Sequence, residues 1–264
     1  IFRKNQPFFF FYGAIWKQML GSFTHFFVQN EDSQQLLATL DFTKNITMNG
    51  DTRFDRVLEI AANFTSVAGI EKFCGDSPVI VAGSTWEEDE IELLHFVNVN
   101  KQVKFIIAPH EIDKTNLKDV KEEFPDSIFY SELENKHSST ANVLIIDNMG
   151  MLSRLYKYAT VTYVGGGYGA DGVHNVLEAA VYGKPVVFGP VYEKFYEAIG
   201  LVNSGGAISI DGGPVKLETV LNGLLNDETE RKTRGEAAVQ FVQDNAGASK
   251  KIMQFIQEKR LLTS

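Results

Sequence analysis

Residues 161–190 read VTYVGGGYGADGVHNVLEAAVYGKPVVFGP, and this stretch decides the fold of the chain. The apolar, β-branched run 160–164 predicts a buried strand, and five glycines follow within residues 165–172. Residues 174–182 have the apolar spacing of a helix, and Gly183 stands where helices commonly end in glycine. A second apolar strand over 185–188 completes a βαβ unit with a glycine-rich first turn.

The glycine-rich turn predicts a site for an anion. Glycines let backbone N–H groups approach a ligand closely, and the start of a helix adds partial positive charge. Asn175 and Glu178 are three positions apart, so they share one face of the first helical turn. A carboxylate there accepts hydrogen bonds from two vicinal hydroxyls, as a ribose offers, and an amide reaches a phosphate or a sugar hydroxyl. The alternative is a tight turn with a solvated Glu178, but the glycines fall together with His174, Asn175 and Glu178, which favours a ligand site.

A dinucleotide-binding fingerprint also matches this turn. Gly167, Gly169 and Gly172 give the spacing G-x-G-x-x-G between a strand and a helix. The unit lies late in the chain, however, and its second strand ends in Gly189-Pro190, where an acidic residue for the ribose is expected. We therefore interpret the match as accidental.

Composition restricts the class of protein. The 264 residues suffice for one large or two modest domains, and 44% hydrophobic and 22% charged content is ordinary for a soluble α/β protein. A net charge of −9 and a pI of about 5.1 argue against a nucleic-acid binder. Cys74 is the single cysteine and cannot form an internal disulfide, which indicates a reducing compartment. The sequence shows no apolar run of about 18 residues and no signal peptide.

Aromatic residues crowd the start of the chain, with Arg3, Lys4 and Lys17 between them. They are Phe2, Phe8, Phe9, Phe10, Phe11, Tyr12, Trp16, Phe23, Phe26 and Phe27. One interpretation is a surface that touches a membrane or an acyl chain, since aromatic and basic residues together suit that interface. The interpretation we favour is a helix packed on its own domain, with Ile15, Met19 and Leu20 in the core.

Strand and helix patterns alternate along most of the chain. Further strands are predicted over 24–29, 45–48, 78–82, 103–108, 127–130, 143–146 and 207–210. Further helices are predicted from residue 30 or 32 to 40 and over 52–64, 87–97, 115–123, 151–158, 215–225, 228–243 and 249–259, with a polar loop over 135–141. We place a domain boundary near residues 49–51. The alternation predicts a parallel, doubly wound sheet.

In such sheets a ligand lies beyond the carboxyl ends of the strands, so the residues that follow the strands should converge. They are Ser84 and Thr85, then Pro109, His110 and Glu111, then Asn148, Met149 and Gly150, and finally residues 165–178. Ser84 and Thr85 can hold a phosphate, although residues of this kind more often cap a helix. His110 can donate to a phosphate or be an inconsequential loop histidine. Met149 and Gly150 can offer backbone N–H groups and an apolar wall for a base.

The strand ends carry hydrogen-bond donors, backbone amides and a glutamate, but no residue cluster of metal-ligand type. There is no nucleophile elbow and no P-loop pattern. We predict that the acidic run 87–90 is a solvated helix start, stabilised by the helix dipole. The sequence therefore predicts a nucleotide-binding half without a catalytic base of its own.

The chain resembles bacterial 3-deoxy-D-manno-octulosonic acid (Kdo) transferases, two-domain GT-B enzymes of glycosyltransferase family 30. The resemblance covers nearly the whole chain and rests on five motifs. These are GDTRFD at 50–55, GSTWEE at 83–88, APHE at 108–111, DNMG at 147–150, and the run from VGG at 164–166 to HNVLEAA at 174–180. The last two together are fairly specific, whereas the glycine and glutamate unit alone is common to many GT-B enzymes.

The resemblance implies transfer of Kdo from CMP-Kdo to a lipid A precursor, in lipopolysaccharide biosynthesis, at the cytoplasmic face of the bacterial inner membrane. It implies no metal and no cofactor other than the donor substrate. Met149 and Gly150 would contact the nucleotide, and Asn175 and Glu178 would hold phosphate and ribose, while Gly166 and Gly167 let the phosphate approach. The full predicted donor site is Ser84, Thr85, Pro109, His110, Asn148, Met149, Gly150, Gly166, Gly167, His174, Asn175 and Glu178.

Two residues depart from the family pattern. The family commonly has Pro-Arg-His where this chain has Pro109-His110-Glu111, so His110 replaces a phosphate-binding arginine. Arg53 stands where lysine is common. The first change puts donor affinity and its pH dependence in question, because histidine is largely neutral at pH 7.

The family's membrane anchor, acceptor site and catalytic glutamate lie in an N-terminal region that this sequence does not show. We expect residues 1–50 to be the tail of that acceptor domain and residues 51–264 to be the donor-binding domain. The chain, which begins at Ile1, is then a soluble fragment that binds donor without turnover. Exposed aromatic residues at its start would drive dimerisation.

Two other hypotheses stay open. The nearest alternative is a different GT-B protein, such as a UDP-sugar transferase or a UDP-sugar 2-epimerase, which would prefer uridine where Kdo transfer requires cytidine. A scaffold domain with the aromatic start as its partner surface would bind no nucleotide, and Glu178→Ala would leave its partner binding unchanged.

Overall fold

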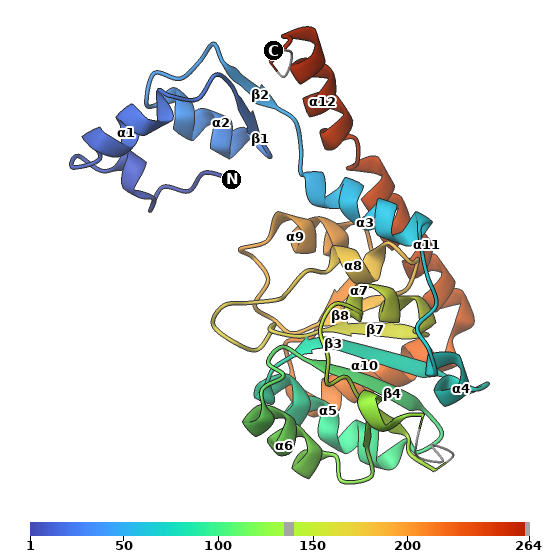
Figure 1. Cartoon of the computed structure of the whole chain (residues 1–264). Helices are drawn as coiled ribbons and strands as arrows, with labels where there is room; N and C mark the ends of the chain where they lie inside the picture. Colours follow the sequence, from blue (N-terminus) through green and yellow to red (C-terminus); the bar gives the residue numbers. More distant parts are fainter. Residues whose placement is uncertain (135–139, 262–264) are drawn as a thin grey trace. The chain divides into compact units, whose positions relative to one another are not determined.

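The computed structural model describes residues 1–134 and 140–261, and these form two compact units (Figure 1). The small unit comprises Ile1–Arg56 and Asp244–Ser264, and the large unit comprises Val57–Gln243. The chain division between the units lies after Arg56, and the C-terminal segment belongs to the small unit. The assignment of residues 1–50 to an acceptor domain stays a prediction. The expected polar loop over 135–141 falls largely on residues 135–139, outside the described residues.

The large unit contains a seven-stranded sheet in which every pair is parallel, in the order β5-β6-β4-β3-β7-β8-β9. The strands are β3 (Val79–Thr85), β4 (Lys104–Pro109), β5 (Ile128–Phe129), β6 (Val143–Ile145), β7 (Val161–Val164), β8 (Val186–Phe188) and β9 (Ala207–Ser209). The chain builds the sheet outward from β3 to one side and then returns to add β7 on the other. The predicted doubly wound parallel sheet is therefore confirmed, with its switch point between β3 and β7.

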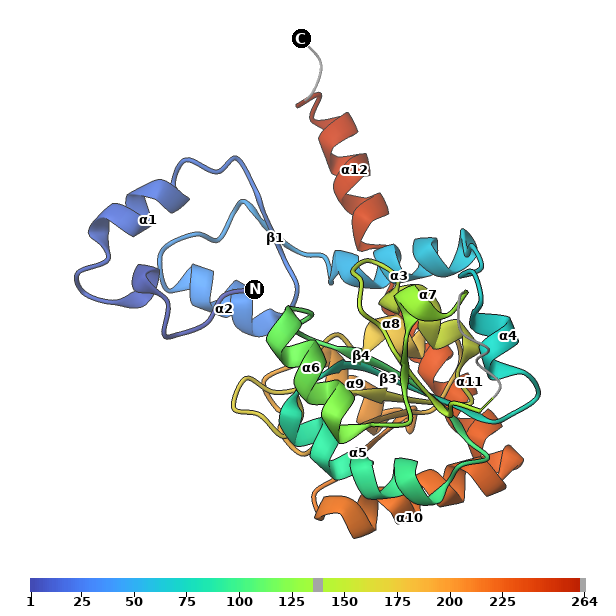
Figure 2. The same cartoon turned by 60° about the horizontal axis from the view of Figure 1, so that its bottom comes forward.

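Helices cover both faces of this sheet. They are α4 (Ile70–Cys74), α5 (Glu87–Val99), α6 (Lys114–Glu123), α7 (Leu152–Leu155), α8 (Leu177–Ala180), α9 (Tyr196–Asn203), α10 (Gly213–Asn226) and α11 (Glu228–Asp244), with 3-10 turns η2 (Tyr130–Glu132) and η3 (Tyr156–Tyr158). Helices α5, α6 and α10 lie on one face and α7 and α8 on the other (Figures 1 and 2). Helices α4 and α9 were not expected from the sequence. The helix predicted over 174–182 is a single turn that begins at Leu177.

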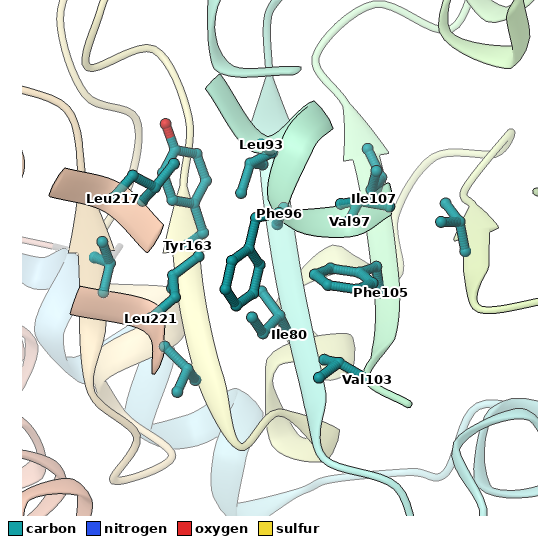
Figure 3. Packing of buried hydrophobic residues seen from close by; sticks show 14 of the residues in the cluster. Ile80, Leu93, Phe96, Val97, Val103, Phe105, Ile107, Tyr163, Leu217 and Leu221 are labelled. Carbon is teal, nitrogen blue, oxygen red and sulfur yellow. The ribbon is translucent and has the colours of Figure 1, made fainter. Parts of the chain in front are cut away.

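The core of the large unit lies between the sheet and helices α5 and α10 (Figure 3). Ile80, Phe105 and Tyr163 project from the strands, and Phe96 and Leu217 project from the two helices. The rings of Phe96 and Phe105 meet edge to face, with centroids 6.1 Å apart. Burying a side chain of this size contributes about 1.5–3 kcal/mol to folding. Helices cover both faces of the sheet, so strand residues that point to either face are apolar. The strands therefore appear in the sequence as continuous apolar runs.

The small unit is built on two parallel strands, β1 (Phe26–Val28) and β2 (Ile46–Met48), joined by α2 (Glu31–Ala38). Asn30 caps α2, because its side-chain oxygen accepts the Ser33 backbone N–H at 2.9 Å. The unit also contains η1 (Pro7–Phe9), α1 (Ala14–Leu20) and α12 (Ala248–Glu258), and α3 (Thr52–Ala62) begins in it and ends in the large unit. The buried apolar core of the small unit is Leu20, Phe26, Val28 and Leu37.

Specific contacts explain why α12 belongs to the small unit. Asp55 accepts the backbone N–H groups of Gly247 at 2.7 Å and of Ser249 at 3.0 Å, which satisfies two donors at the start of α12. The Phe255 ring packs on His25 and Phe27, with centroid separations of 4.3 and 5.2 Å. These long-range partners leave no trace in the local sequence of the C-terminal helix.

The aromatic start of the chain is more exposed than predicted. Leu20 is buried, but Ile15 is 73% exposed and Met19 is 54% exposed, so the prediction of a three-residue core on this helix is wrong at two positions. Phe11 is 99% exposed. Leu20 is the buried residue of α1. Within the described residues, no helix combines the length and the apolar character needed to cross a membrane.

Candidate functional site

The predicted site residues gather at the carboxyl ends of the strands, around the switch point between β3 and β7. The loop after β3 and the glycine-rich loop after β7 are neighbours, since their strands are directly paired. The loop after β6 lies two strands from β3 and three from β7, or roughly 10 and 14 Å at ordinary strand spacing. The sheet therefore sets residues 148–150 at one end of a row of loops and residues 165–178 at the other.

The glycines of the loop after β7 are required by packing within the protein. Gly166 has φ +87°, and a Cβ there would lie 2.6 Å from the Gly172 carbonyl oxygen. A Cβ on Gly167 would lie 2.5 Å from the backbone nitrogen of Gly189, in the next loop. A side chain at either position would thus collide with backbone. These contacts give the glycines a structural role, and the predicted approach of a phosphate to Gly166 and Gly167 stays a prediction.

The buried carboxylate of Asp89 anchors the glycine-rich loop after β7. Asp89 is fully buried and accepts three hydrogen bonds, from the Tyr163 hydroxyl at 2.6 Å, the Gly166 backbone N–H at 2.8 Å and the Trp86 backbone N–H at 3.0 Å. Glu90 is also buried. The prediction that residues 87–90 form a solvated helix start is therefore wrong for these two, because the first turn of α5 points them under the loops; Glu87 and Glu88 are exposed.

Burial shifts the pKa of both acids upward. Desolvation raises the pKa of Glu90 to about 7, against the Thr85 hydroxyl, which donates to its Oε1 at 2.7 Å. Desolvation also raises the pKa of Asp89, and the three donors on its carboxylate oppose that shift. Asp89 Oδ2 faces two backbone N–H groups, which can only donate, while Oδ1 faces the Tyr163 hydroxyl.

The loop after β3 carries a strained residue. Ser84 has φ +54° and sits at a register shift between Gly83 and Thr85 in the pairing of β3 with β4. A left-handed conformation costs a residue other than glycine about 1–3 kcal/mol and is common at functional sites. Thr85 is buried, and its hydroxyl donates to Glu90.

Three rings stack across the switch point. The Trp86 and His110 rings lie 4.6 Å apart at 26°, and the His110 and His174 rings lie 4.3 Å apart at 19°. The Trp86 indole N–H also donates to His174 Nε2 at 2.8 Å. The structure thus joins the loops after β3, β4 and β7, and it brings the predicted residues His110 and His174 together. We call Trp86, His110 and His174 the ring stack.

Burial, the largest cause, and the neighbouring His110 lower the pKa of His174, and Asp171 opposes them. The lowered pKa favours the neutral ring. Trp86, Asp89 and Tyr163 were not among the predicted site residues. Trp86 alone had a signal in the sequence, its place directly after a strand, whereas the long-range partners of Asp89 and Tyr163 had none.

Asn175 and Glu178 lie together as their spacing predicted. The Asn175 amide donates to Glu178 Oε1 at 3.0 Å, and the Asn175 oxygen accepts the Leu177 backbone N–H at 3.3 Å. Asn175 therefore accepts the first backbone N–H of α8 through an i+2 bond and donates to Glu178 at the same time. The pair offers a carboxylate and an amide at the start of a helical turn.

The remaining predicted residues lie along the same edge of the sheet. Pro109 is buried at the end of β4. Met149 is 83% exposed and Gly150 has φ +90°, while Asn148 is exposed beside them. Among the described residues, these three make no hydrogen bond or ring contact to the ring stack. The strand order sets them on the same edge of the sheet as the ring stack.

The described residues contain no group of three or more His, Cys, Asp and Glu side chains placed to hold a metal ion. A cavity of about 520 Å³ opens beside edge strand β9, between Pro190, Ser209 and Arg234. It includes none of the predicted site residues.

No protein-family model matches the chain. It is 28% identical to a bifunctional glycosyltransferase/methyltransferase of Fusobacterium nucleatum, over 93% of this chain and 36% of that protein. It is 26% identical to a 3-deoxy-D-manno-octulosonic acid transferase of Rickettsia felis, over 92% of this chain and 53% of that protein. The chain thus spans about a third to a half of the length of these relatives.

The solved structures with similar folds include the following two. One is the C-terminal CMP-Kdo binding domain of WaaA from Acinetobacter baumannii, with a TM-score of 0.56 and 20% identity over 72% of this chain and 99% of that one. The other is a UDP-N-acetylglucosamine 2-epimerase, with a TM-score of 0.59 and 16% identity over 92% of this chain and 62% of that one. The predicted resemblance to Kdo transferases is confirmed, and so is the GT-B type of α/β fold.

Proposed function

We propose that this chain is the donor-binding half of a glycosyltransferase that moves Kdo from CMP-Kdo to a lipid A precursor. The observation that carries the proposal is the arrangement at the β3–β7 switch point, where the ring stack adjoins the Asn175–Glu178 pair. Similarity to Kdo transferases over most of the chain supports the same conclusion. The activity of the whole enzyme would depend on residues that complete the acceptor side.

The described residues suit distinct parts of a CMP-sugar. Glu178, oriented by Asn175, would accept the two ribose hydroxyls. His110 and His174 would donate to phosphate, and the exposed Met149 side chain beside Gly150 would cover the base. The loop after β6 lies about 10 Å from the loop after β3 and about 14 Å from the loop after β7, which is comparable to the length of a nucleotide. No described residue is proposed as the catalytic base, and no metal is proposed.

In the whole enzyme, a base on the acceptor side would remove the proton of the acceptor hydroxyl. That oxygen would attack the anomeric carbon of Kdo, and the bond to the phosphate oxygen of CMP would break with inversion. This chain would hold CMP as the leaving group throughout. By itself it would bind donor and not turn it over, and transfer to a lipid acceptor by this chain alone would contradict that part of the proposal.

The test is a calorimetric titration of the chain with CMP, UMP and UDP in EDTA. We expect CMP to bind without a metal and Glu178→Gln to weaken binding at least tenfold, since the ribose hydroxyls lose a charged acceptor. Glu236→Gln, on the exposed surface of α11, is the matched control and should bind as the parent does. Absence of binding by all three nucleotides would overturn the proposal and favour a scaffold.

A second candidate is a UDP-sugar enzyme, because the fold is at least as similar to the 2-epimerase as to the CMP-Kdo binding domain. The same titration separates the two. A preference for UDP or UMP over CMP would favour the epimerase or another uridine-dependent GT-B enzyme.

The aromatic start suggests where such an enzyme would work. Residues 1–30 contain Arg3, Lys4 and Lys17 and no acidic residue, whereas the whole chain carries −9. We propose that this segment contacts the cytoplasmic face of the bacterial inner membrane, or pairs two copies when no membrane is present. Flotation with anionic vesicles and sedimentation without them test the two parts. No flotation together with a clean monomer would contradict both.

A further inference from the structure

The ring stack contains a hydrogen bond whose direction is known. The Trp86 indole nitrogen lies 2.8 Å from His174 Nε2, and an indole N–H donates and never accepts. His174 Nε2 must therefore accept, which requires a lone pair on that nitrogen. A histidine whose Nε2 accepts carries its single proton on Nδ1 and has no net charge.

We propose that Trp86 is a positioning residue that fixes His174 as the neutral Nδ1–H tautomer, so that His174 offers its ligand one uncharged N–H donor. This inference rests on the proposed function for the identity of the ligand, a phosphate or carboxylate group of a nucleotide sugar. The tautomer itself does not depend on that function.

The environment of His174 supports a neutral ring. Its half-buried side chain stacks on His110, so two positive charges would face each other at 4.3 Å. Asp171, on the glycine-rich loop, is the opposing negative group, and burial outweighs it. Among the described residues, Nδ1 of His174 has no hydrogen-bond partner, so its proton is available to a ligand.

Trp86 is itself held in place. Its backbone N–H donates to the buried Asp89, which also accepts the Gly166 N–H from the loop that carries His174. One carboxylate therefore fixes the relative positions of the residue that donates and of the loop that presents the acceptor. The Trp86 ring is also held by stacking on the His110 ring.

A neutral N–H at His174 gives direction to the anion and little Coulomb attraction. The exposed His110 ring stacks on both Trp86 and His174 and accepts no hydrogen bond from Trp86 in this structure. The two histidines therefore have unequal parts in the site.

The test is long-range ¹H–¹⁵N NMR of the imidazole nitrogens in the full chain at pH 7, without ligand. His110→Ala and His174→Ala assign the signals. We expect His174 to show a pyrrole-type Nδ1 and a pyridine-type Nε2. A protonated Nε2 in the parent protein, with or without a second proton on Nδ1, would overturn the inference.

Trp86→Phe retains an aromatic ring for stacking and removes the N–H. We expect the two nitrogen shifts of His174 to move toward each other, as the tautomer is no longer fixed, and CMP affinity to fall about 3- to 10-fold, as expected for loss of one hydrogen bond. Trp16→Phe, in the small unit, is the matched control and should change neither quantity. Unchanged His174 shifts in Trp86→Phe would refute the role of Trp86.

The two arms separate the two proposals. If the parent shows the expected tautomer and no nucleotide binds, the proposed function fails and the assignment of His174 stands. If CMP binds and the tautomer is the other one, the reverse holds.

Discussion

Replacing Asp89 tests whether a buried carboxylate holds the glycine-rich loop. Asp89→Ala would leave the Tyr163 hydroxyl and the backbone N–H groups of Gly166 and Trp86 without their acceptor. Each buried donor that loses its partner costs about 1–3 kcal/mol. Trp86 is partly exposed, so water can replace part of its loss. We therefore expect the free energy of unfolding to fall by about 3–5 kcal/mol.

The assay is urea unfolding followed by tryptophan fluorescence. The chain has two tryptophans, and Trp16 lies in the small unit while Trp86 lies in the large one. A Trp16→Phe background makes Trp86 the only reporter, so the transition describes the large unit alone. Glu88→Ala is the matched control, since Glu88 is exposed on the same helical turn, and its loss should cost no more than about 1 kcal/mol.

A double-mutant cycle with Tyr163→Phe identifies the hydrogen bond. In the parent background, Tyr163→Phe should cost about 1–2 kcal/mol, because one Asp89 oxygen loses its donor. In the Asp89→Ala background it should cost nearly nothing, because the hydroxyl has no acceptor left to lose. If Asp89→Ala costs no more than Glu88→Ala, Asp89 is a solvated residue at a helix start and the reasoning is refuted.

Two further predictions use the same unfolding assay. Glu90 has its pKa raised to about 7, so the folded protein retains a proton that the unfolded chain has released near pH 4.5, and stability is lost as pH rises between these values. Glu90→Gln should therefore be about 3 kcal/mol more stable than the parent at pH 8 and equal to it at pH 4, and an equal difference at both pH values would contradict the assignment. Gly167→Ala should destabilise the large unit by about 1–3 kcal/mol, since its Cβ would meet the Gly189 backbone, while Gly223→Ala, exposed in α10 with open space around it, should stabilise by about 0.5–1 kcal/mol. A similar effect of both substitutions would show that packing does not distinguish the two glycines.

The sequence determined the elements that rest on local pattern. The apolar runs predicted at 160–164 and 185–188 correspond to strands β7 and β8. Parallel strands that are buried on both faces are apolar throughout, so they can be recognised from the local sequence alone. The same argument gave the parallel sheet and the convergence of its loops. The spacing of Asn175 and Glu178 predicted their proximity, since three residues of chain already bring them to one side of a turn.

Tertiary structure decided everything that depends on a distant partner. The acidic run 87–90 looks solvated in sequence, and only the approach of Tyr163 and Gly166 makes Asp89 a buried acceptor. Phe255 and Asp55 place α12 in the small unit through contacts nearly 200 or more residues apart in sequence. The sequence predicted His110 and His174 as site residues, but their stacking and the hydrogen bond from Trp86 to His174 arise only because β3, β4 and β7 set their loops side by side. A local sequence pattern shows which face of a helix or strand is apolar. It does not show which distant donor will contact a given side chain, because that depends on the order of the strands in the sheet.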